Sequence, residues 1–196
     1  MSTLTEPQLD ALREIANIGS GNASTALAAT IGQEVGIDVP KTLVLSMAEA
    51  VEAVGPVETE MTAIMLGVVG DFTSAVLLLT RPADASVLYG VFGLEPGDEM
   101  ADSALAEIGN IVGTAYINAL AAITGLEIEP TPPAVVTDML GAIVSTVIAS
   151  RGGAEDRVLL LDSNLGLEGD QECELTFVLV PDGPAIDLLL ERLGVA

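Results

Sequence analysis

Apolar residues recur at helical spacing in two long segments of the chain, and this pattern predicts the two principal helices. The first helix is predicted from about Glu6 to Thr30 and the second from about Glu99 to Thr124. The apolar positions of each fall on one stripe, which contains Leu12, Ile15, Ala16, Gly19, Ala23 and Ala26 in the first helix and Leu105, Ile108, Val112, Tyr116, Ala119 and Ile123 in the second. An apolar stripe must face a core, so the opposite stripe is predicted to face water.

Shorter elements follow each long helix in the same predicted order: an extended stretch ending near a proline, a short helix, two strands and a closing helix. The predicted bounds are Met47 to Val54, Thr62 to Val69, Phe72 to Thr80 and Ala83 to Phe92 in the first half, and Asp138 to Ala149, Arg157 to Leu161, Cys173 to Val180 and Pro184 to Leu193 in the second. Gly70-Asp71 predicts a two-residue hairpin turn. The stretch from Leu94 to Glu99 is predicted to link the halves.

The two halves are related to one another by an internal repeat. Glu14 to Pro40 aligns with Glu107 to Pro133 without a gap, at a constant offset of 93 residues. Each half alone has too few strands for a stable sheet. We therefore expect a single α+β domain over residues 1–196, in which repeat halves of about 6–93 and 99–194 share one mainly antiparallel sheet with pseudo-twofold symmetry. The two long helices are expected to be exposed on its surface.

The water-facing stripe of each long helix carries a glutamate and, three residues later, an asparagine. The first stripe contains Asp10, Glu14 and Asn17, and the second contains Ser103, Glu107 and Asn110. A solvated helix face would account for one such copy, but the recurrence at identical spacing favours a docking surface for another protein. Gly19 is predicted to let the first helix approach the sheet closely. Gly21 and Thr114 are predicted to keep the surface low just beyond the asparagine of each stripe.

The charge balance narrows the choice of partners. The chain has 29 Asp and Glu residues against 6 Lys and Arg, no His, and a formal net charge of −23. This charge repels nucleic acid and anionic membranes, so neither is an expected partner. The acidic residues are spread along the chain and form no single block, which favours a general adaptation of the surface to a salty, halophilic cytoplasm.

Cys173 is the only cysteine, so neither an intrachain disulfide nor a cysteine-based metal cluster is possible, and it is expected to pack in the core. The windows Ile15 to Gln33 and Ile108 to Leu126 are free of charge and long enough for a bilayer. Their many Asn, Ser, Thr and Gly residues are more typical of core helices. With a polar, acidic N-terminus, these features predict a cytoplasmic protein.

At the Glu/Asn stripes the sequence resembles the CheC/CheX/FliY family of CheY-P phosphatases. The family pattern is Asp or Ser, three residues, Glu, two residues, Asn, 22 residues and Pro. Both copies meet every spacing, the first from Asp10 to Pro40 and the second from Ser103 to Pro133. Two intact copies make the resemblance greater to the CheC branch than to CheX, which carries one working copy.

This resemblance implies dephosphorylation of the phospho-aspartate of the response regulator CheY, and a second partner, the chemoreceptor deamidase CheD. It implies that Asn17 and Asn110 orient the attacking water, and that Glu14 and Glu107 pair with the receiver's lysine. Asp10 and Ser103 would contact the receiver at the rim. The receiver would supply Mg²⁺, and the chain itself would need no cofactor and no metal, because catalysis of phosphoryl transfer is largely positioning.

Two other functions remain open at this stage. A hydrolase could use Glu14 and Glu107 as acid and base, which requires the two carboxylates within about 10 Å of each other. Alternatively, the chain could be a non-catalytic binding module that regulates CheD, with the helix from Asp138 to Ala149 as a candidate surface for it. Pro40 and Pro133 are expected to fix the entry of the chain into a strand, without a catalytic role.

Overall fold

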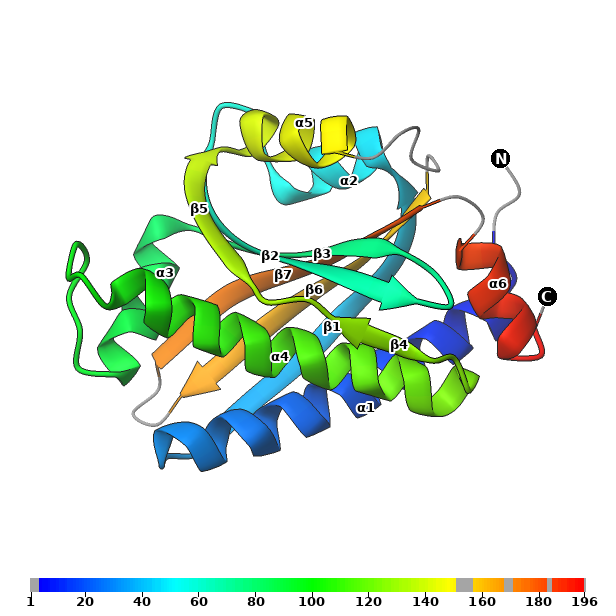
Figure 1. Cartoon of the computed structure of the whole chain (residues 1–196), viewed down its shortest axis with the longest axis horizontal. Helices are drawn as coiled ribbons and strands as arrows, with labels where there is room; N and C mark the ends of the chain where they lie inside the picture. The colour runs from blue at the N-terminus through cyan, green and yellow to red at the C-terminus, as the bar shows by residue number, and fades with distance from the viewer. Residues whose placement is uncertain (1–3, 151–156, 168–170, 183–184, 196) are drawn as a thin grey trace.

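The computed structural model describes residues 4–150, 157–167, 171–182 and 185–195. Two long helices, α1 (Glu6–Ile31) and α4 (Ala101–Thr124), run antiparallel along one face of a curled sheet (Figure 1). Both end at a glycine in the left-handed conformation, Gly32 with φ 72° and Gly125 with φ 68°. A glycine there lets the backbone turn out of the helix without steric cost, so the repeat fixes the same end for both helices.

The strands form one antiparallel sheet that joins the two halves. Their bounds are Val35–Ser46 (β1), Glu60–Gly70 (β2), Ser74–Thr80 (β3), Ile128–Pro130 (β4), Ala134–Met139 (β5), Arg157–Leu167 (β6) and Gln171–Pro181 (β7). The order is β1-β6-β7-β3-β2-β4, with β5 also paired to β2. The first strand of each half therefore pairs with the hairpin of the other half. This order is symmetric about the β7–β3 pair, as the internal repeat predicts.

The first strand of each half is irregular at the same place. In β1 the pairing with β6 shifts register between Asp38 and Lys41. In the second half the equivalent strand is interrupted at residues 131–133, which separate β4 from β5. Both irregularities contain the proline of the repeat. Proline has no N–H to donate to a sheet, so the strand must bulge or break where it stands.

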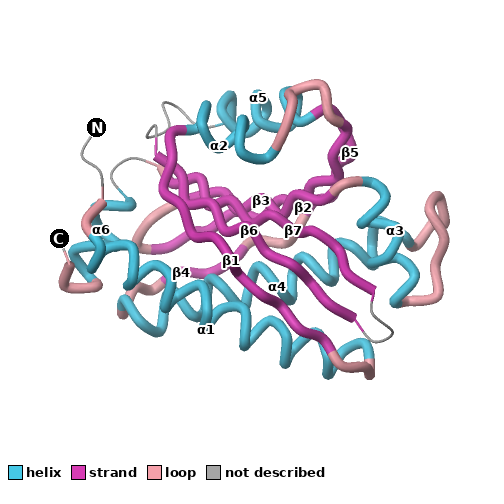
Figure 2. Tube along the Cα trace, turned by 180° about the vertical axis from the view of Figure 1, so that it is seen from behind, coloured by secondary structure: helices cyan, strands magenta, loops and turns pink. Residues whose placement is uncertain are grey.

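Shorter helices complete the fold. α2 (Met47–Val54) and α5 (Leu140–Ser150) cover the face of the sheet opposite α1 and α4 (Figure 2). α3 (Pro82–Val91) and α6 (Ala185–Arg192) lie at opposite ends of the sheet (Figure 1). The protein thus has one apolar core on each side of the sheet.

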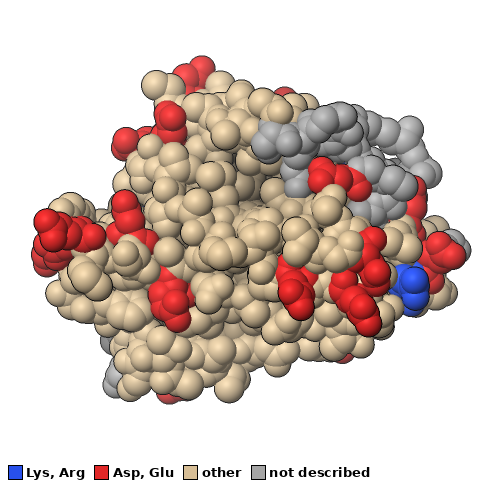
Figure 3. Space-filling view, viewed as in Figure 1, with Lys and Arg blue, Asp and Glu red and all other residues tan. Residues whose placement is uncertain are grey.

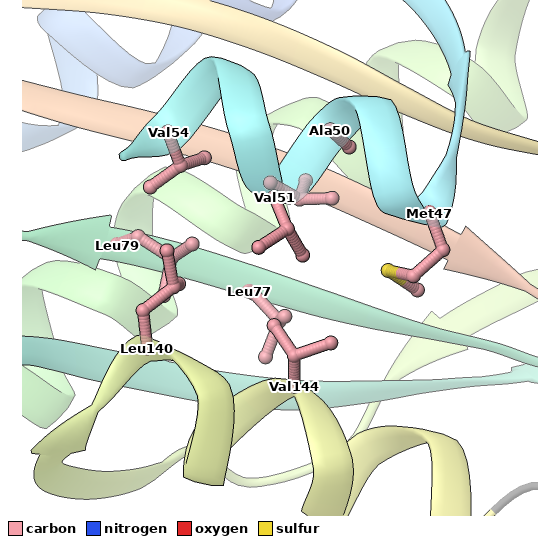
Figure 4. A pocket seen from close by; sticks show the side chains of 9 residues that line it. Met47, Ala50, Val51, Val54, Leu77, Leu79, Leu140 and Val144 are labelled. Atoms are coloured by element: carbon pink, nitrogen blue, oxygen red, sulfur yellow. The ribbon is translucent and has the colours of Figure 1, made fainter. Parts of the chain in front are cut away.

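The smaller core lies between α2, α5 and the sheet. Figure 4 shows Met47 and Val51 of α2 facing Leu140 and Val144 of α5 across a small apolar cavity. Leu77 of β3 lines the same cavity from the sheet and is 2% exposed. The larger core lies under α1 and α4, and it includes the apolar stripes of both helices.

The predicted α+β class and the shared antiparallel sheet are confirmed. The strand predicted from Arg157 to Leu161 is longer and ends at Leu167, and four other local predictions need correction. The turn after β2 is longer than two residues, because Asp71 bonds to another loop: its N–H donates to the carbonyl of Glu127 at 2.9 Å, and its carboxylate accepts from the N–H of Glu127 at 2.9 Å. β3 consequently begins at Ser74, and Phe72 is buried in the core instead of starting the strand.

The other three corrections concern the helices and their glycine. Asp138 belongs to β5, where it pairs with Met61, so α5 starts two residues later than predicted. Ala26 and Ile123 are exposed, because at these turns the following residues, Leu27 and Thr124, face the core instead. Gly19 faces α4 and not the sheet. The predicted start of the last helix at Pro184 lies outside the described residues.

α4 is the only described helix whose length and composition would let it cross a membrane. Half of the residues in its most apolar window are buried inside the protein. Such a helix is weak evidence for a membrane span, because a buried core helix has the same length and composition. Its apolarity is accounted for here by the core that it covers.

Candidate functional site on the exposed faces of α1 and α4

The Glu/Asn stripe of α1 lies in solvent, as predicted. Asp10, Glu14 and Asn17 are all exposed, whereas Leu12 and Ile15 on the opposite side of the helix are 2% and 4% exposed. Residues three or four apart project from the same side of a helix. The backbone of α1 therefore holds the carboxylate and the amide side by side without any further support.

The stripe of α4 differs in one respect from that of α1. Ser103 and Glu107 are exposed, but Asn110 is half-buried. It lies where α4 packs close to the sheet. A Cβ on Gly109 would overlap Ile64 of β2, so only glycine permits this approach. The amide of Asn110 is thus held in a more confined position than that of Asn17.

Ser103, Glu107 and Asn110 line an open groove between α4 and the connection from β4 to β5. Its other wall is formed by Pro130, Thr131, Pro132 and Pro133. Asn110 also borders a second hollow, which lies between α1 and α4. Pro133 was expected only to fix the entry of the chain into a strand, so its place in this wall was missed. The fixed spacing of 22 residues from Asn110 to Pro133 was the signal for it, because such a spacing ties the proline to the helix.

The two copies also differ in charge. Arg13 of α1 donates to the carboxylate of Asp10 at 2.8 Å and lies 3.9 Å from the carboxylate of Glu6. The equivalent position of α4 is Ala106, so the α4 copy has no cation there. The Arg13–Asp10 pair is exposed, and its contribution to stability is therefore small, on the order of 0–1 kcal/mol. Because of this pair, the Asp10 carboxylate already has an ionic partner within the chain.

Glu14 and Glu107 do not form a two-carboxylate site. Gly19 of α1 contacts Tyr116 of α4, and the two helices run antiparallel from that point. Glu14 lies five residues before Gly19, and Glu107 lies nine residues before Tyr116 in the opposite direction. At a rise of 1.5 Å per residue, the two glutamates are about 20 Å apart along the helix axes, which is too far for paired acid and base catalysis.

Comparison with known proteins agrees with these motifs. The model of the CheC-like family matches residues 8–44 and 100–137, so each match begins near the start of a long helix and extends beyond its motif proline. The chain is thus similar to the CheC-like family over both copies of the motif. CheY-P phosphatase CheC of Bacillus subtilis is 28% identical over 200 residues, which cover 97% of this chain and 96% of that protein.

Solved structures share the fold of this chain. FliY of Thermotoga maritima superposes with a TM-score of 0.81 at 19% identity and covers 98% of both chains. A chain of the FliM–SpeE complex from H. pylori gives 0.74 at 14% identity, covering 98% of this chain and 97% of that one. A chain of the CheX–CheY–BeF₃–Mg²⁺ complex from Borrelia burgdorferi gives 0.50 at 19% identity, covering 85% and 97%.

Proposed function

We propose that this CheC-like protein dephosphorylates the phospho-aspartate of a CheY receiver. The observation that carries the proposal is the presence of two intact Glu–x–x–Asn motifs on the outer faces of α1 and α4, each at the family spacing from its proline. The similar protein from Bacillus subtilis is named a CheY-P phosphatase. The structure of the CheX–CheY complex shares the fold, which supports CheY as the partner.

Asn17 and Asn110 are assigned to orient the attacking water. An acyl phosphate is already prone to hydrolysis, and the receiver would bring its own Mg²⁺ and lysine, so the added catalyst has only to place a water in line. A carboxamide does this through its carbonyl oxygen without changing its protonation. The half-buried position of Asn110 supports this role, because a confined amide loses less freedom when it binds the water.

Glu14 and Glu107 are assigned to dock the receiver by pairing with its lysine. Both carboxylates are exposed and lie one helical turn from the asparagine. Asp10 and Ser103 lie one turn further out and are assigned to the rim of the contact. In the α1 copy the Arg13–Asp10 pair must open, or be accommodated, when a receiver binds.

A second candidate function is that of a binding module. It is favoured by the FliY and FliM likenesses, which have higher TM-scores than the chain of the CheX–CheY complex, and the FliM structures include complexes with SpeE and FliG. The fold is therefore used for binding as well as for catalysis. Binding of the deamidase CheD stays a prediction from the family resemblance, as does the assignment of α5 to that contact.

Removal of the two amides tests the proposal. Asn17→Ala and Asn110→Ala should each remove the part of the dephosphorylation rate that its own site contributes. The double variant should dephosphorylate the receiver about a hundredfold more slowly than the parent. The measurement is loss of phosphate from purified phospho-receiver with Mg²⁺. Asn118→Ala is the matched control, because Asn118 is an exposed asparagine of α4 outside the motif. A double variant as fast as the parent would overturn the phosphatase assignment in favour of the binding module.

A further inference from the structure

The break between β4 and β5 is closed by Thr131. The N–H of Thr131 donates to the carbonyl oxygen of Gly67 in β2 at 2.8 Å. In return, the N–H of Gly67 donates to the hydroxyl oxygen of Thr131 at 2.8 Å. Thr131 therefore uses its backbone and its side chain together to fasten the connection onto β2. We call this pair of hydrogen bonds the Thr131–Gly67 clip.

The clip satisfies a donor that the broken strand leaves without a partner. Val68 of β2 pairs with Pro130, and Met65 pairs with Ala134. Between these pairs the connection from β4 to β5 has three residues where β2 has two, so the connection carries one extra residue. The prolines at 132 and 133 have no N–H that could donate a hydrogen bond to β2. A hydroxyl is the group that supplies an acceptor for the Gly67 N–H here. An unsatisfied buried N–H would cost about 1–3 kcal/mol.

Gly67 and Thr131 also fit each other sterically. A Cβ added to Gly67 would lie 3.0 Å from the hydroxyl oxygen of Thr131 and 3.2 Å from its methyl carbon. Contacts this short are uncommon, so a larger residue at position 67 would push the connection away from the strand. The glycine thus allows the close approach, and the threonine fixes it.

The connection held in this way is the wall of the groove beside Asn110. Pro132 and Pro133 follow the clip directly and line the groove together with Glu107 and Asn110. We propose that Thr131 is a positioning residue of the α4 site: it holds this proline wall in place so that a receiver can dock between the wall and α4. This role rests on the proposed phosphatase function. Thr131 touches neither the water nor the phosphoryl group.

The α1 site has no such clip. Its counterpart of Thr131 is Asp38, at the repeat offset, and the counterpart of Gly67 is Asn164, which pairs in register with Asp38. An aspartate and an asparagine have replaced the threonine and the glycine, and both are exposed. A change at Thr131 should therefore affect one site and spare the other, which makes the role testable within a single protein.

The test uses the full chain with one working site. In the Asn17→Ala background only the α4 site turns over. Thr131→Val is nearly isosteric but removes the acceptor, and it should raise the KM for phospho-receiver about tenfold while kcat changes less than about twofold. Thr131→Ser keeps the hydroxyl and should restore the KM. In a titration with BeF₃⁻-activated receiver, the α4 site of the valine variant should show the same loss of affinity, while the α1 site, which keeps Glu14, should bind as before.

Measuring Thr131→Val in the Asn110→Ala background distinguishes a positioning role of Thr131 from a general loss of stability. With Asn110→Ala, only the α1 site turns over, and Thr131→Val should then leave its KM unchanged. Equal losses in both backgrounds, or an unchanged KM in the Asn17→Ala background, would overturn the role of Thr131 alone. Turnover that survives the loss of both asparagines would overturn the phosphatase function and the role of Thr131 with it.

Discussion

Gly19 of α1 lies directly against the aromatic ring of Tyr116 of α4. A Cβ at position 19 would overlap that ring, which is buried and packs on Phe177 of β7 with ring centroids 4.8 Å apart. The ring is therefore held between Gly19 on α1 and Phe177 on the sheet. The distance between the two long helices is set by a residue that has no side chain.

Gly19→Ala should destabilise the fold by up to about 2 kcal/mol. Alanine is the better helix former by about 1 kcal/mol, but forcing a methyl group into a packed core costs about 1–3 kcal/mol. Gly21→Ala is the matched control in the same helix, since no atom lies within 4 Å of a Cβ there. It should stabilise the protein by about 0.5–1 kcal/mol. Urea unfolding of both variants checks the prediction, and equal shifts for the two would contradict it.

Replacing the motif glutamates should produce a defect that depends on salt. Glu107→Gln, made in the Asn17→Ala background, should weaken receiver binding at low salt because a charge partner of the receiver's lysine is lost. The defect should shrink at about 1 M salt, where the pair is screened in any case. Glu52→Gln on α2 removes the same charge from an exposed residue on the opposite face of the sheet, and should leave binding unchanged. A defect of constant size from low to high salt would argue against an ion pair.

Stability should rise steeply as salt is added. The chain has a formal net charge of −23, and acidic side chains are scattered over the face seen in Figure 3. Its few cationic side chains form ion pairs with carboxylates, such as Lys41 with Asp162 at 3.0 Å. Repulsion between the remaining carboxylates acts over about 10 Å at 0.1 M salt but only about 3 Å at 1 M. The melting temperature in NaCl from millimolar to molar checks this, and a flat curve would exclude the halophilic interpretation.

Alkaline pH should destabilise the fold through two buried groups. Burial raises the pKa of Tyr116 to about 12, and burial followed by the negative charge of Asp84 raises the pKa of Cys173 to about 12. In the unfolded chain these groups ionise near 10.0 and 9.0. Between about pH 9 and 12 the unfolded state therefore binds fewer protons than the folded state, and the free energy of unfolding falls as pH rises.

Tyr116→Phe should make this fall less steep, because one of the titrating groups is removed. The measurement is the slope of unfolding free energy against pH between 9 and 11, compared with the slope of the parent. The slope is used because the substitution also changes packing beside Gly19, which shifts stability at every pH. Identical slopes in parent and variant would show that Tyr116 ionises alike in both states.

The repeat was the most informative feature of the sequence. The offset of 93 residues carries Gly32 onto Gly125 and the start of β1 at Val35 onto the start of β4 at Ile128. The ends of the two long helices and the exposed Glu/Asn stripes depend on local sequence, so they could be predicted from it. The expectation of a shared sheet followed from the number of strands in each half.

Features that depend on distant contacts could not be predicted. Gly19 was expected to approach the sheet, and nothing local indicates that Tyr116 occupies the space beside it. The turn at Asp71 follows from bonds to Glu127, a residue of the other half. The shape of the groove beside Asn110 depends on the bond between Thr131 and Gly67, whereas the spacing from Asn110 to Pro133 indicates only that the proline is tied to the helix.

The exchange of first strands between the halves has a consequence for synthesis. β1 is made early, yet its partner β6 follows more than a hundred residues later, with Val35 pairing with Leu167. The first half therefore leaves the ribosome with an unpaired strand, and the sheet closes only after nearly the whole chain has been made. Pairing at such separation makes folding slow and exposes the growing chain to aggregation. A break anywhere before β6 would leave a fragment with an open edge, not a smaller working copy.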